Sequence, residues 1–459
     1  MLGTRSETAP KLEDLQARFG DHIHTTADAG WEQSRLAWNL ITDQRPTIVV
    51  QPANAEDVAA VFAYARAAGL KVAAQGTGHG AGNSLGNLEG RMLLQMSRIR
   101  GVTIDPATRR ARVEAGTVWD DVAAAAAPHG LAGLAGSSPN VGVIGYSLGG
   151  GQGWLGRRYG LAANAVKAVE AVLADGRIVR ADADSEPELF WAIRGGGGSF
   201  AVVTAIEIEL APVATAYAGF MLWPIERASE VLHTWLEWTR DVSDDVTTCG
   251  RIMQFPPIPD VPELVRGRSF VGIDGAILAA EPEAAAIIKP LKDLGPEVDT
   301  FATVPAPALG RIHLDPEDPV PAIPDAIVVR DFDAEALDAL LAATAPAAPS
   351  ALLMVDIRHL GGALSRPQPT HGSAGVLGGE HLVFGVGMAM SPEMAGATSA
   401  SLDAVMAAVK PWAAERQYMN LADRPRPAED FFAPADLARL RAVRAHYDPD
   451  GLLLSNRPL

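Results

Sequence analysis

The pattern of hydrophobic and polar residues changes along the chain near Pro212. Before that residue, short apolar runs alternate with amphipathic stretches. The segment Asn54–Gly69 is predicted to be a helix, because its apolar side chains recur at three- and four-residue spacing and a glycine ends it. Ala165–Leu173 and Arg177–Ala181 flank an Asp-Gly pair, which predicts a hairpin. Further strands are expected at 46–51, 71–75, 91–96, 102–105 and 110–115, and a further helix at 117–129.

After Pro212, longer strands alternate with helices, a pattern typical of an antiparallel sheet with helices covering one face. The expected strands are Tyr217–Trp223, Val246–Phe255, Ser269–Leu278, Ala351–His359 and His381–Met390. The expected helices are Ile225–Val242, Glu281–Leu294, Ala334–Ala345 and Met394–Lys410. Two proline-rich segments, Pro256–Val265 and Val304–Pro324, are expected to be loops.

Length and composition limit the class of protein. At 459 residues the chain is too long for one ordinary hydrophobic core, so two domains are expected. A formal net charge of −17 argues against nucleic acid and against an anionic membrane as partners. No apolar run approaches the roughly 20 residues that span a bilayer. Met1–Gly20 lacks the apolar stretch of a signal peptide, and the single cysteine, Cys249, fits a reducing compartment, so a cytoplasmic location is expected.

A histidine stands inside a glycine-rich loop directly after one of the expected strands. The residues from Gln75 to Gly80 read Gln-Gly-Thr-Gly-His-Gly, with the histidine at position 79. Glycines at this spacing allow a sharp turn and bring backbone N–H groups close to a phosphate. Taken alone, the loop favours a histidine that only caps a turn, and the further glycine-rich segments reverse this interpretation.

Two further glycine-rich blocks and the C-terminal segment extend this pattern. One block runs from Gly136 to Gly160 and the other from Glu188 to Thr204. Near the C-terminus the chain reads Tyr418-Met-Asn-Leu421 and then Tyr447-Asp-Pro449. In this order and at these distances, the region from about Thr42 to Asn456 resembles the berberine-bridge-enzyme-like FAD-linked oxidases. These proteins belong to the vanillyl-alcohol oxidase / p-cresol methylhydroxylase (PCMH) superfamily.

The resemblance implies an α+β fold with FAD as the cofactor. It implies a PCMH-type FAD-binding domain of two subdomains over residues 1–212 and a substrate domain over 213–410. Residues 411–459 would return to the FAD domain, with Tyr418–Leu421 as a strand that borders the site. No set of His, Asp or Glu residues has the spacing of a metal site, and the loop Asp315–Asp318 is expected to be solvated.

The resemblance places His79 where the family attaches the flavin covalently through its 8α-methyl group. Such a bond raises the reduction potential of the flavin and retains the cofactor. Many relatives carry a second, cysteinyl link, but the matching residue here is Ser138, so a single covalent link is expected. The alternative, a second bond from Cys249, is disfavoured because that residue falls in an expected strand of the substrate domain.

Other residues of these blocks are expected to contact FAD through backbone groups or small side chains. Gly76, Thr77, Gly78 and Gly80 would approach the pyrophosphate, and Gly149, Gly150, Gly151 and Gly153 would leave space for the ribityl chain. The other expected contacts are Asn83, Ser137, Ser138, Asn140, Val141, Gly142, Gly145, Tyr146, Val203, Asn420 and Asn456. The resemblance places Val141 where a small side chain leaves room for O2, which favours an oxidase. For any single glycine, a plain turn role is an equal alternative.

Oxidation by a flavin is helped by a base within hydrogen-bond reach of the substrate. On the expected strand Ala351–His359, Asp356 and Arg358 should face the flavin, so Asp356 is the first candidate base. The alternative is a purely structural Asp–Arg pair. Tyr418 is the second candidate, and Tyr146 could donate a hydrogen bond where the family often has histidine. His313 is placed in a loop at the pocket mouth.

The expected strand His381–Met390 departs from the family. Its bulky face, which includes Phe384 and Val386, is expected beneath the helices, so the face with Val383 and Gly385 should point toward the flavin. Relatives carry base-forming residues on this strand. Their apparent loss here puts the usual proton abstraction in doubt and leaves room for a bulky substrate.

These inferences predict an FAD-dependent oxidase that removes a hydride from a C–H bond of a small aromatic or natural-product-like substrate. Its electrons would pass to O2 and give H2O2. One alternative is a dehydrogenase with an organic acceptor, and another is a sugar or alcohol oxidase. A third is a catalytically silent FAD-binding protein, which the missing base would explain.

Overall fold

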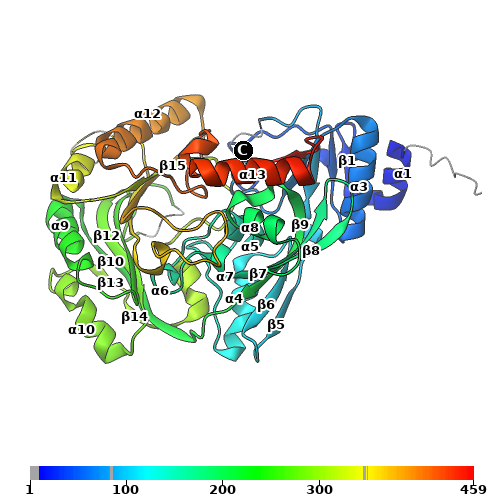
Figure 1. Cartoon of the computed structure of the whole chain (residues 1–459). Helices are drawn as coiled ribbons and strands as arrows, with labels where there is room; N and C mark the ends of the chain where they lie inside the picture. Colours follow the sequence, from blue (N-terminus) through cyan, green and yellow to red (C-terminus); the bar gives the residue numbers. More distant parts are fainter. Residues whose placement is uncertain (1–9, 83–85, 260, 262, 345–347, 349) are drawn as a thin grey trace, which may run out of the picture.

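The computed structural model describes residues 10–82, 86–259, 261, 263–344, 348 and 350–459. Three β-sheets and the helices around them form two lobes that lie side by side in Figure 1. The smaller sheets lie in the lobe that holds both the blue N-terminal part and the red helix α13 (Pro434–Tyr447). The mixture of helices with largely antiparallel sheets confirms the predicted α+β fold.

The first sheet is parallel except at one edge, and it carries the strand that leads into the histidine loop. Its order is β1 (Ile23–Thr25), β2 (Ile48–Val50), β4 (Met92–Gln95), β3 (Val72–Gln75) and β18 (Leu453–Leu454). The last strand comes from the C-terminal segment and pairs in parallel with β3. The chain end is thereby built into the sheet that presents His79.

The second sheet is antiparallel and follows the order β5 (Val102–Asp105), β6 (Arg110–Glu114), β9 (Ala201–Glu209), β7 (Val166–Leu173) and β8 (Ile178–Ala181). The expected hairpin is β7 and β8, with Gly176 at a φ of 90° in its turn. One hydrophobic core joins the first two sheets to the C-terminal helix α13, from Leu15 to Leu210 and again from Met419 to Leu453.

The third sheet is antiparallel and larger. Its order is β13 (Val298–Asp299), β10 (Thr215–Pro224), β12 (Ser269–Ile277), β11 (Val246–Gln254), β16 (Met354–His359), β17 (His381–Met388) and β15 (Ala322–Val329), with β14 (Ala302–Pro305) also pairing with β10. A second core fills the space between one face of this sheet and four helices. The opposite face is left for the site.

The helices that precede the third sheet in the chain are α1 (Leu12–Phe19), α2 (Trp31–Ser34), α3 (Ala55–Ala68), α4 (Trp119–Ala126), α5 (Val143–Leu148), α6 (Gly156–Tyr159), α7 (Ala162–Ala165) and α8 (Pro187–Gly196). Of these, α6 contacts β11 of the third sheet. The third sheet is covered by α9 (Ala228–Thr239), α10 (Glu281–Lys292), α11 (Ala334–Ala342) and α12 (Pro392–Val409). Within the described residues, none of these helices has the length and apolar character needed to cross a bilayer.

The predicted orientation of β17 is wrong. Its small residues face the helices, because α12 crosses the strand so closely that a Cβ on Gly385 would lie 2.9 Å from Leu402 and one on Gly387 2.8 Å from Thr398. Its bulky residues Phe384 and Val386 therefore face the opposite side, together with Met354 and Asp356 of the neighbouring strand. Val383 and Gly385 do not border the site. Their side chains therefore give no evidence that a catalytic base is missing.

Two local predictions also differ from the structure. Tyr418–Leu421 is a turn and not a strand, because the N–H of Ala422 donates to the carbonyl of Tyr418 four residues earlier. The segment Val304–Pro324 is a loop only in part, because it begins in β14, continues as a 3-10 helix over Ala306–Arg311 and ends in β15, the edge strand of the third sheet.

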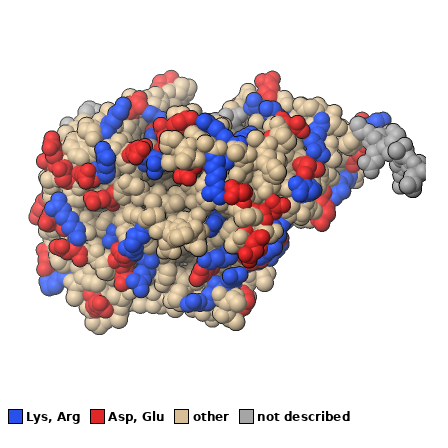
Figure 2. All heavy atoms as spheres, in the orientation of Figure 1, with Lys and Arg blue, Asp and Glu red and all other residues tan. Residues whose placement is uncertain are grey.

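The surface seen in Figure 2 carries Lys and Arg side chains interspersed with Asp and Glu, and uncharged residues occupy the middle of the view. Mixed charges of this kind, at a net charge of −17, offer no continuous basic stripe for a nucleic acid on this face.

Candidate functional site

A cavity of about 600 Å³ lies between the glycine-rich loops of the first lobe and the helix-free face of the third sheet. Its wall includes segments of all three glycine-rich blocks, of β11, β16 and β17, and of both the 418–423 turn and the C-terminal strand. This volume falls within the range of cavities that hold cofactors or small substrates. Segments far apart in the sequence thus converge on one site.

His79 occupies a defined position in this wall. Its ring stacks on the indole of Trp38, with 4.0 Å between ring centroids and 16° between planes. Its Nε2 is buried and has no hydrogen-bond partner. Burial lowers the pKa of His79 to about 4, although Asn140 and Asp315 act in the opposite direction. The imidazole is therefore neutral at pH 7, and no described residue forms a hydrogen bond with its Nε2.

Most of the predicted FAD contacts line this cavity. They are Gly76, Thr77, Gly78, His79, Gly80, Ser137, Ser138, Val141, Gly142, Gly145, Tyr146, Gly149, Val203, Asn420 and Asn456. Gly78 has a φ of 84°, and a Cβ there would lie 2.7 Å from the backbone of Ala37, so only glycine fits this turn. Asn83 lies outside the described residues. Asn140 is held behind the wall, where its side-chain amide donates to the carbonyl of Glu317.

The predicted role of three glycines is not supported by their positions. Gly150, Gly151 and Gly153 lie behind the wall, where they make room for aromatic rings or backbone and not for a ribityl chain. A Cβ on Gly150 would lie 2.8 Å from the ring of Tyr418, and one on Gly151 2.6 Å from the ring of Tyr146. These glycines set the positions of the two tyrosines.

The two tyrosines present their rings to the cavity from opposite segments. The hydroxyl of Tyr146 is buried without a partner. Burial raises the pKa of Tyr418 to about 12, although its oxygen accepts hydrogen bonds from the backbone of Gln152, at 2.8 Å, and of Gly151 and from the side chain of Asn420. Asn420 also donates to the carbonyl of Tyr146 at 2.8 Å and so ties the 418–423 turn to α5.

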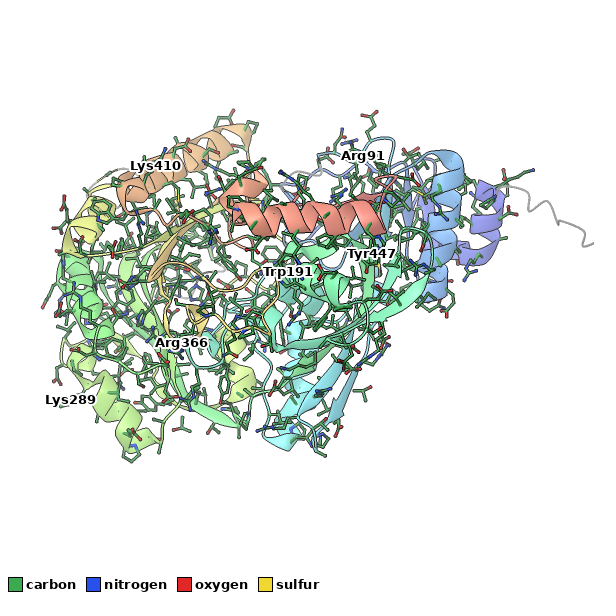
Figure 3. The ribbon with its side chains drawn as sticks, in the orientation of Figure 1. Arg91, Trp191, Lys289, Arg366, Lys410 and Tyr447 are labelled. Carbon is green, nitrogen blue, oxygen red and sulfur yellow. The ribbon has the colours of Figure 1, made fainter. Side chains whose placement is uncertain are left out.

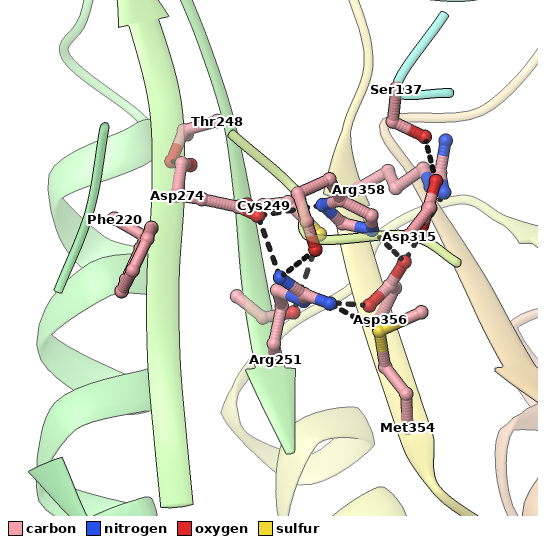
Figure 4. A network of polar contacts seen from close by, with 12 residues as sticks. Ser137, Phe220, Thr248, Cys249, Arg251, Asp274, Asp315, Met354, Asp356 and Arg358 are labelled. Atoms are coloured by element: carbon pink, nitrogen blue, oxygen red, sulfur yellow. Dashed lines mark hydrogen bonds and ion pairs between the residues drawn. The ribbon is translucent and has the colours of Figure 1, made fainter. Parts of the chain in front are cut away.

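Asp356 lies in a buried charge network and not on the cavity wall (Figure 4). Its side chain is fully buried and accepts hydrogen bonds from His313 Nε2 at 2.9 Å, Arg251 Nε at 3.3 Å and Arg358 Nη2 at 3.2 Å. Although burial alone would raise it, the pKa of Asp356 is held far below its usual range by His313 and the two arginines. A carboxylate with this position and these partners is not a competent base, which argues against the first predicted candidate.

His313 is also buried in this network, and its predicted place at the pocket mouth is wrong. Its Nδ1 lies 2.6 Å from Asp274 Oδ2, so the ring bridges two carboxylates. Burial and Arg251 lower the pKa of His313, but Asp274 and Asp356 outweigh them and raise it to about 9. The imidazole is cationic at pH 7 and donates to both acids.

The structure also corrects the prediction for the Asp315–Asp318 loop. Asp315 is not solvated: it lines the cavity and its Oδ2 accepts hydrogen bonds of 2.7 Å from both Ser137 and Ser138. This contact joins the second glycine-rich block to the substrate half of the molecule. Within the described residues, no cluster of three or more His, Cys, Asp or Glu side chains could hold a metal ion.

Cys249 lies in β11 with 2% of its surface exposed and does not belong to the cavity wall. Burial raises the pKa of its thiol well above the usual value. Its position gives no support to the alternative of a second, cysteinyl attachment.

The sequence analysis missed three residues that shape the site. Trp38 stacks on His79, Arg251 lines the cavity, and Asp274 anchors the network from β12. A signal for Arg251 exists in the sequence, because it alternates with Gly250 and Ile252 on a strand whose other face packs on helices. Trp38 and Asp274 have no comparable local pattern.

The residues of the cavity fit an FAD molecule. A buried, unpartnered imidazole nitrogen, glycine-rich loops at the wall and an apolar wall on the opposite side are what a flavin with a covalent anchor and a phosphate-bearing tail requires. In agreement, the family described as FAD binding domain matches residues 46–182 of this chain.

Several known proteins are similar in sequence. (R)-6-hydroxynicotine oxidase of Paenarthrobacter nicotinovorans is 32% identical over 222 residues, which cover 48% of this chain and 48% of that protein. Glucooligosaccharide oxidase of Sarocladium strictum is 31% identical over 48% of this chain and 45% of its own length. The chain thus aligns with about half the length of these two relatives. The FAD-linked oxidoreductase YvdP of Bacillus subtilis is 27% identical over 93% of this chain and 94% of its own length.

Solved structures extend the likeness to the whole fold. The 6-hydroxy-D-nicotine oxidase of Arthrobacter nicotinovorans superposes with a TM-score of 0.82 at 23% identity, over 94% of this chain and 96% of the other. The berberine-bridge-enzyme-like protein 1 of Physcomitrella patens gives a TM-score of 0.83 at 20% identity, over 98% of both chains. The chain thus contains an FAD binding domain and has the PCMH-type, berberine-bridge-enzyme-like fold, and the relatives that it matches are FAD-linked oxidases and oxidoreductases.

Proposed function

We propose that the protein is an oxidase that binds FAD through a single covalent bond to His79. The observation that carries this proposal is that His79 lines the cavity while its buried Nε2 has no hydrogen-bond partner among the described residues. Ser138 stands where many relatives attach a second time, and its hydroxyl is committed to Asp315. Cys249 is buried elsewhere.

The glycine-rich loops would hold the cofactor. The backbone of Gly76 to Gly80 is open to the cavity and can approach the pyrophosphate, while Gly142, Gly145 and Gly149 border the same space. Bound FAD supplies a two-electron acceptor for a substrate C–H bond. Trp38 keeps the plane of the His79 ring fixed by stacking, so the polypeptide sets the direction of the attachment point.

The substrate would lie against the third sheet. Among the described residues, that part of the wall is apolar except for Arg251, Gln254, Asp315 and Arg358. Its apolar part is formed by residues such as Met253, Phe255, Phe384, Val386 and Met388. A wall of this kind favours an aromatic or natural-product-like substrate over a sugar, which needs many polar partners.

O2 is the proposed electron acceptor, with H2O2 as the product. Val141 lies on the wall beside the histidine loop, and its small side chain leaves space there. The relatives named as oxidases, of 6-hydroxynicotine and of glucooligosaccharide, support the reaction type but name different substrates.

An assay of the purified holoprotein with a panel of aromatic alcohols and simple aldoses tests this proposal. O2 consumption matched by H2O2 formation with aromatic alcohols is expected. Rapid dye reduction with negligible O2 consumption would contradict the oxidase and identify a dehydrogenase. Turnover of aldoses alone would contradict the substrate class.

Tyr418 is the proposed proton acceptor, and its replacement by Phe is expected to lower kcat by about 10²–10⁴-fold. Three donors point at its oxygen, as a phenolate requires, but burial keeps its pKa at about 12. Because the deprotonated form is the base, kcat of the wild type should rise from pH 7 to pH 10. The Tyr418→Phe protein should keep its flavin and lose this rise. A variant with wild-type kcat and pH profile would exclude the role.

A further inference from the structure

We propose that Arg358 forms a subsite for an anionic oxygen of the substrate, such as a carboxylate or an acidic phenol or enol, next to an apolar body. The inference rests on the proposed function, because it names the class of molecule that would enter the same cavity. Two arginines that line the cavity, Arg251 and Arg358, differ in how many of their N–H donors already form hydrogen bonds.

Arg251 has its donors committed inside the protein. Its Nη1 donates to Asp274 at 3.0 Å and to the carbonyl of His313 at 2.9 Å, and its Nε donates to Asp356. Its Nη2 contacts the sulfur of Met354. Only 5% of its side chain is exposed, so Arg251 holds the network together.

Some N–H donors of Arg358 form no hydrogen bond with the described residues. Its Nη2 donates to Asp356 at 3.2 Å and its Nη1 to Gln152 at 3.4 Å, both long for a guanidinium, and its Nε is buried without a partner. A guanidinium has five N–H donors, so more than half of them are unused. Its side chain is 13% exposed and lines the cavity.

Two of the acids near Arg358 do not line the cavity; both are labelled in Figure 4. Asp274 and Asp356 are fully buried and do not line the wall, and the cationic His313 bridges them. The acids on the described wall are Asp315, whose Oδ2 already accepts from Ser137 and Ser138, and Asp423 of the 418–423 turn. Arg358 therefore presents the positive charge of its guanidinium group to the cavity.

The surroundings of Arg358 specify what the rest of the ligand should be. Its guanidinium carbon lies 5.6 Å from the centre of the Phe384 ring, and Met354 lies on the same face of β16. Gln152, which contacts Arg358, follows α5, the helix that carries Tyr146, and its N–H donates to the hydroxyl oxygen of Tyr418. An anionic group at Arg358 would thus place an attached aromatic body between the apolar sheet and the two tyrosines.

Calorimetric titration of the holoprotein with 2-naphthoate and with its neutral isostere 2-naphthamide tests the subsite. The wild type should bind naphthoate about ten- to a hundredfold more tightly than naphthamide. Arg358→Gln should abolish this ratio while leaving the affinity for naphthamide within a few-fold. Arg366→Gln removes the same charge from an exposed arginine paired with Asp244, labelled in Figure 3, and should leave the ratio unchanged.

A second variant keeps the test decisive if Arg358→Gln does not fold. Gln152→Glu is nearly isosteric and places a carboxylate against Arg358, where it should compete with naphthoate and lower the ratio at least tenfold. The proposal is overturned if the wild type shows no preference, or if Arg358→Gln or Gln152→Glu preserves it. It is also overturned if Arg358→Gln alters the flavin absorbance and leaves the ratio intact, because Arg358 then serves the cofactor. Titration needs no turnover, so a protein without oxidase activity would fail the proposed function while still giving a result here.

Discussion

Replacement of Asp356 by Asn is expected to lower the free energy of unfolding by about 3–5 kcal/mol, the range for breaking a buried ion pair by removing one partner. Asp356 is fully buried and accepts from His313, Arg251 and Arg358. An amide has the same shape but leaves these cations with Asp274 as their one fully buried acid. Urea unfolding at pH 7, followed by tryptophan fluorescence, measures the change.

Asp338→Asn is the matched control. Asp338 also pairs with a histidine, at 2.9 Å from His233, but 67% of its side chain is exposed. Its replacement should change the unfolding free energy by no more than about 1 kcal/mol. If Asp356→Asn were as mild as this control, the buried network would contribute nothing to stability, and the account of Asp356 as a structural acid would be wrong.

The network also predicts a pH dependence with a definite sign. The folded-state pKa of His313 is raised from 6.5 to about 9. Its contribution to stability is therefore fully present below about pH 6.5 and is lost as the pH rises through 9. Asp356, whose pKa is lowered, acts in the opposite direction and loses its contribution only in strong acid. Unfolding free energies measured at pH 6, 7.5 and 9 for the wild type and for His313→Gln isolate this contribution, and the difference between the two proteins should shrink as the pH rises to 9.

Gly153→Ala is expected to have the larger effect on folding, a loss of more than about 4 kcal/mol or failure to accumulate as folded protein. A Cβ at this position would lie 1.7 Å from the carbonyl oxygen of Ala135 and 3.1 Å from the hydroxyl of Tyr146. The first neighbour is backbone and cannot rotate away, so the segments that contain Ala135 and Gly153 would have to separate. Expression level and thermal unfolding report the outcome.

Gly396→Ala provides the control for this substitution. Gly396 lies in α12 with nothing within 4 Å of its Cβ position, so alanine should stabilise the protein by about 0.5–1 kcal/mol. A Gly153→Ala protein with wild-type stability would mean that the close packing of this block against Ala135 is not required.

Local signals in the sequence were sufficient where neighbouring residues determine the structure. The helix α3 begins after Asn54, whose side chain accepts from the N–H of Asp57, and ends at Gly69 with a φ of 67°. The cap and the glycine both stand in the sequence, so the boundaries could be predicted. The histidine loop was predicted for the same reason, since it follows β3 directly.

The orientation of β17 could not be predicted in this way, because both of its faces are apolar. Bulky residues usually pack beneath helices, but here α12 approaches so closely that Gly385 and Gly387 face it. Phe384 and Val386 are left to line the cavity. The distance between a strand and a helix depends on tertiary packing. The alternation of residues along a strand carries no information about that distance.

The charge network could not be predicted because its members come from distant segments. Arg251 and Asp356 are 105 residues apart, and His313 reaches both Asp274 and Asp356 from a loop. In the sequence, Asp356 and Arg358 looked like a pair on one strand face, which is correct. The two further partners that turn Asp356 from a base into a structural acid have no signal near it.

The absorbance spectrum of the purified protein before and after acid precipitation tests the central claim most directly. The account predicts a yellow wild-type protein whose flavin absorbance stays with the precipitate, because the cofactor is bonded to His79. In His79→Ala the absorbance should move to the supernatant or be absent from the start. A wild-type protein that releases its flavin into the supernatant would contradict the covalent link. His79 would then have no role in attaching the cofactor.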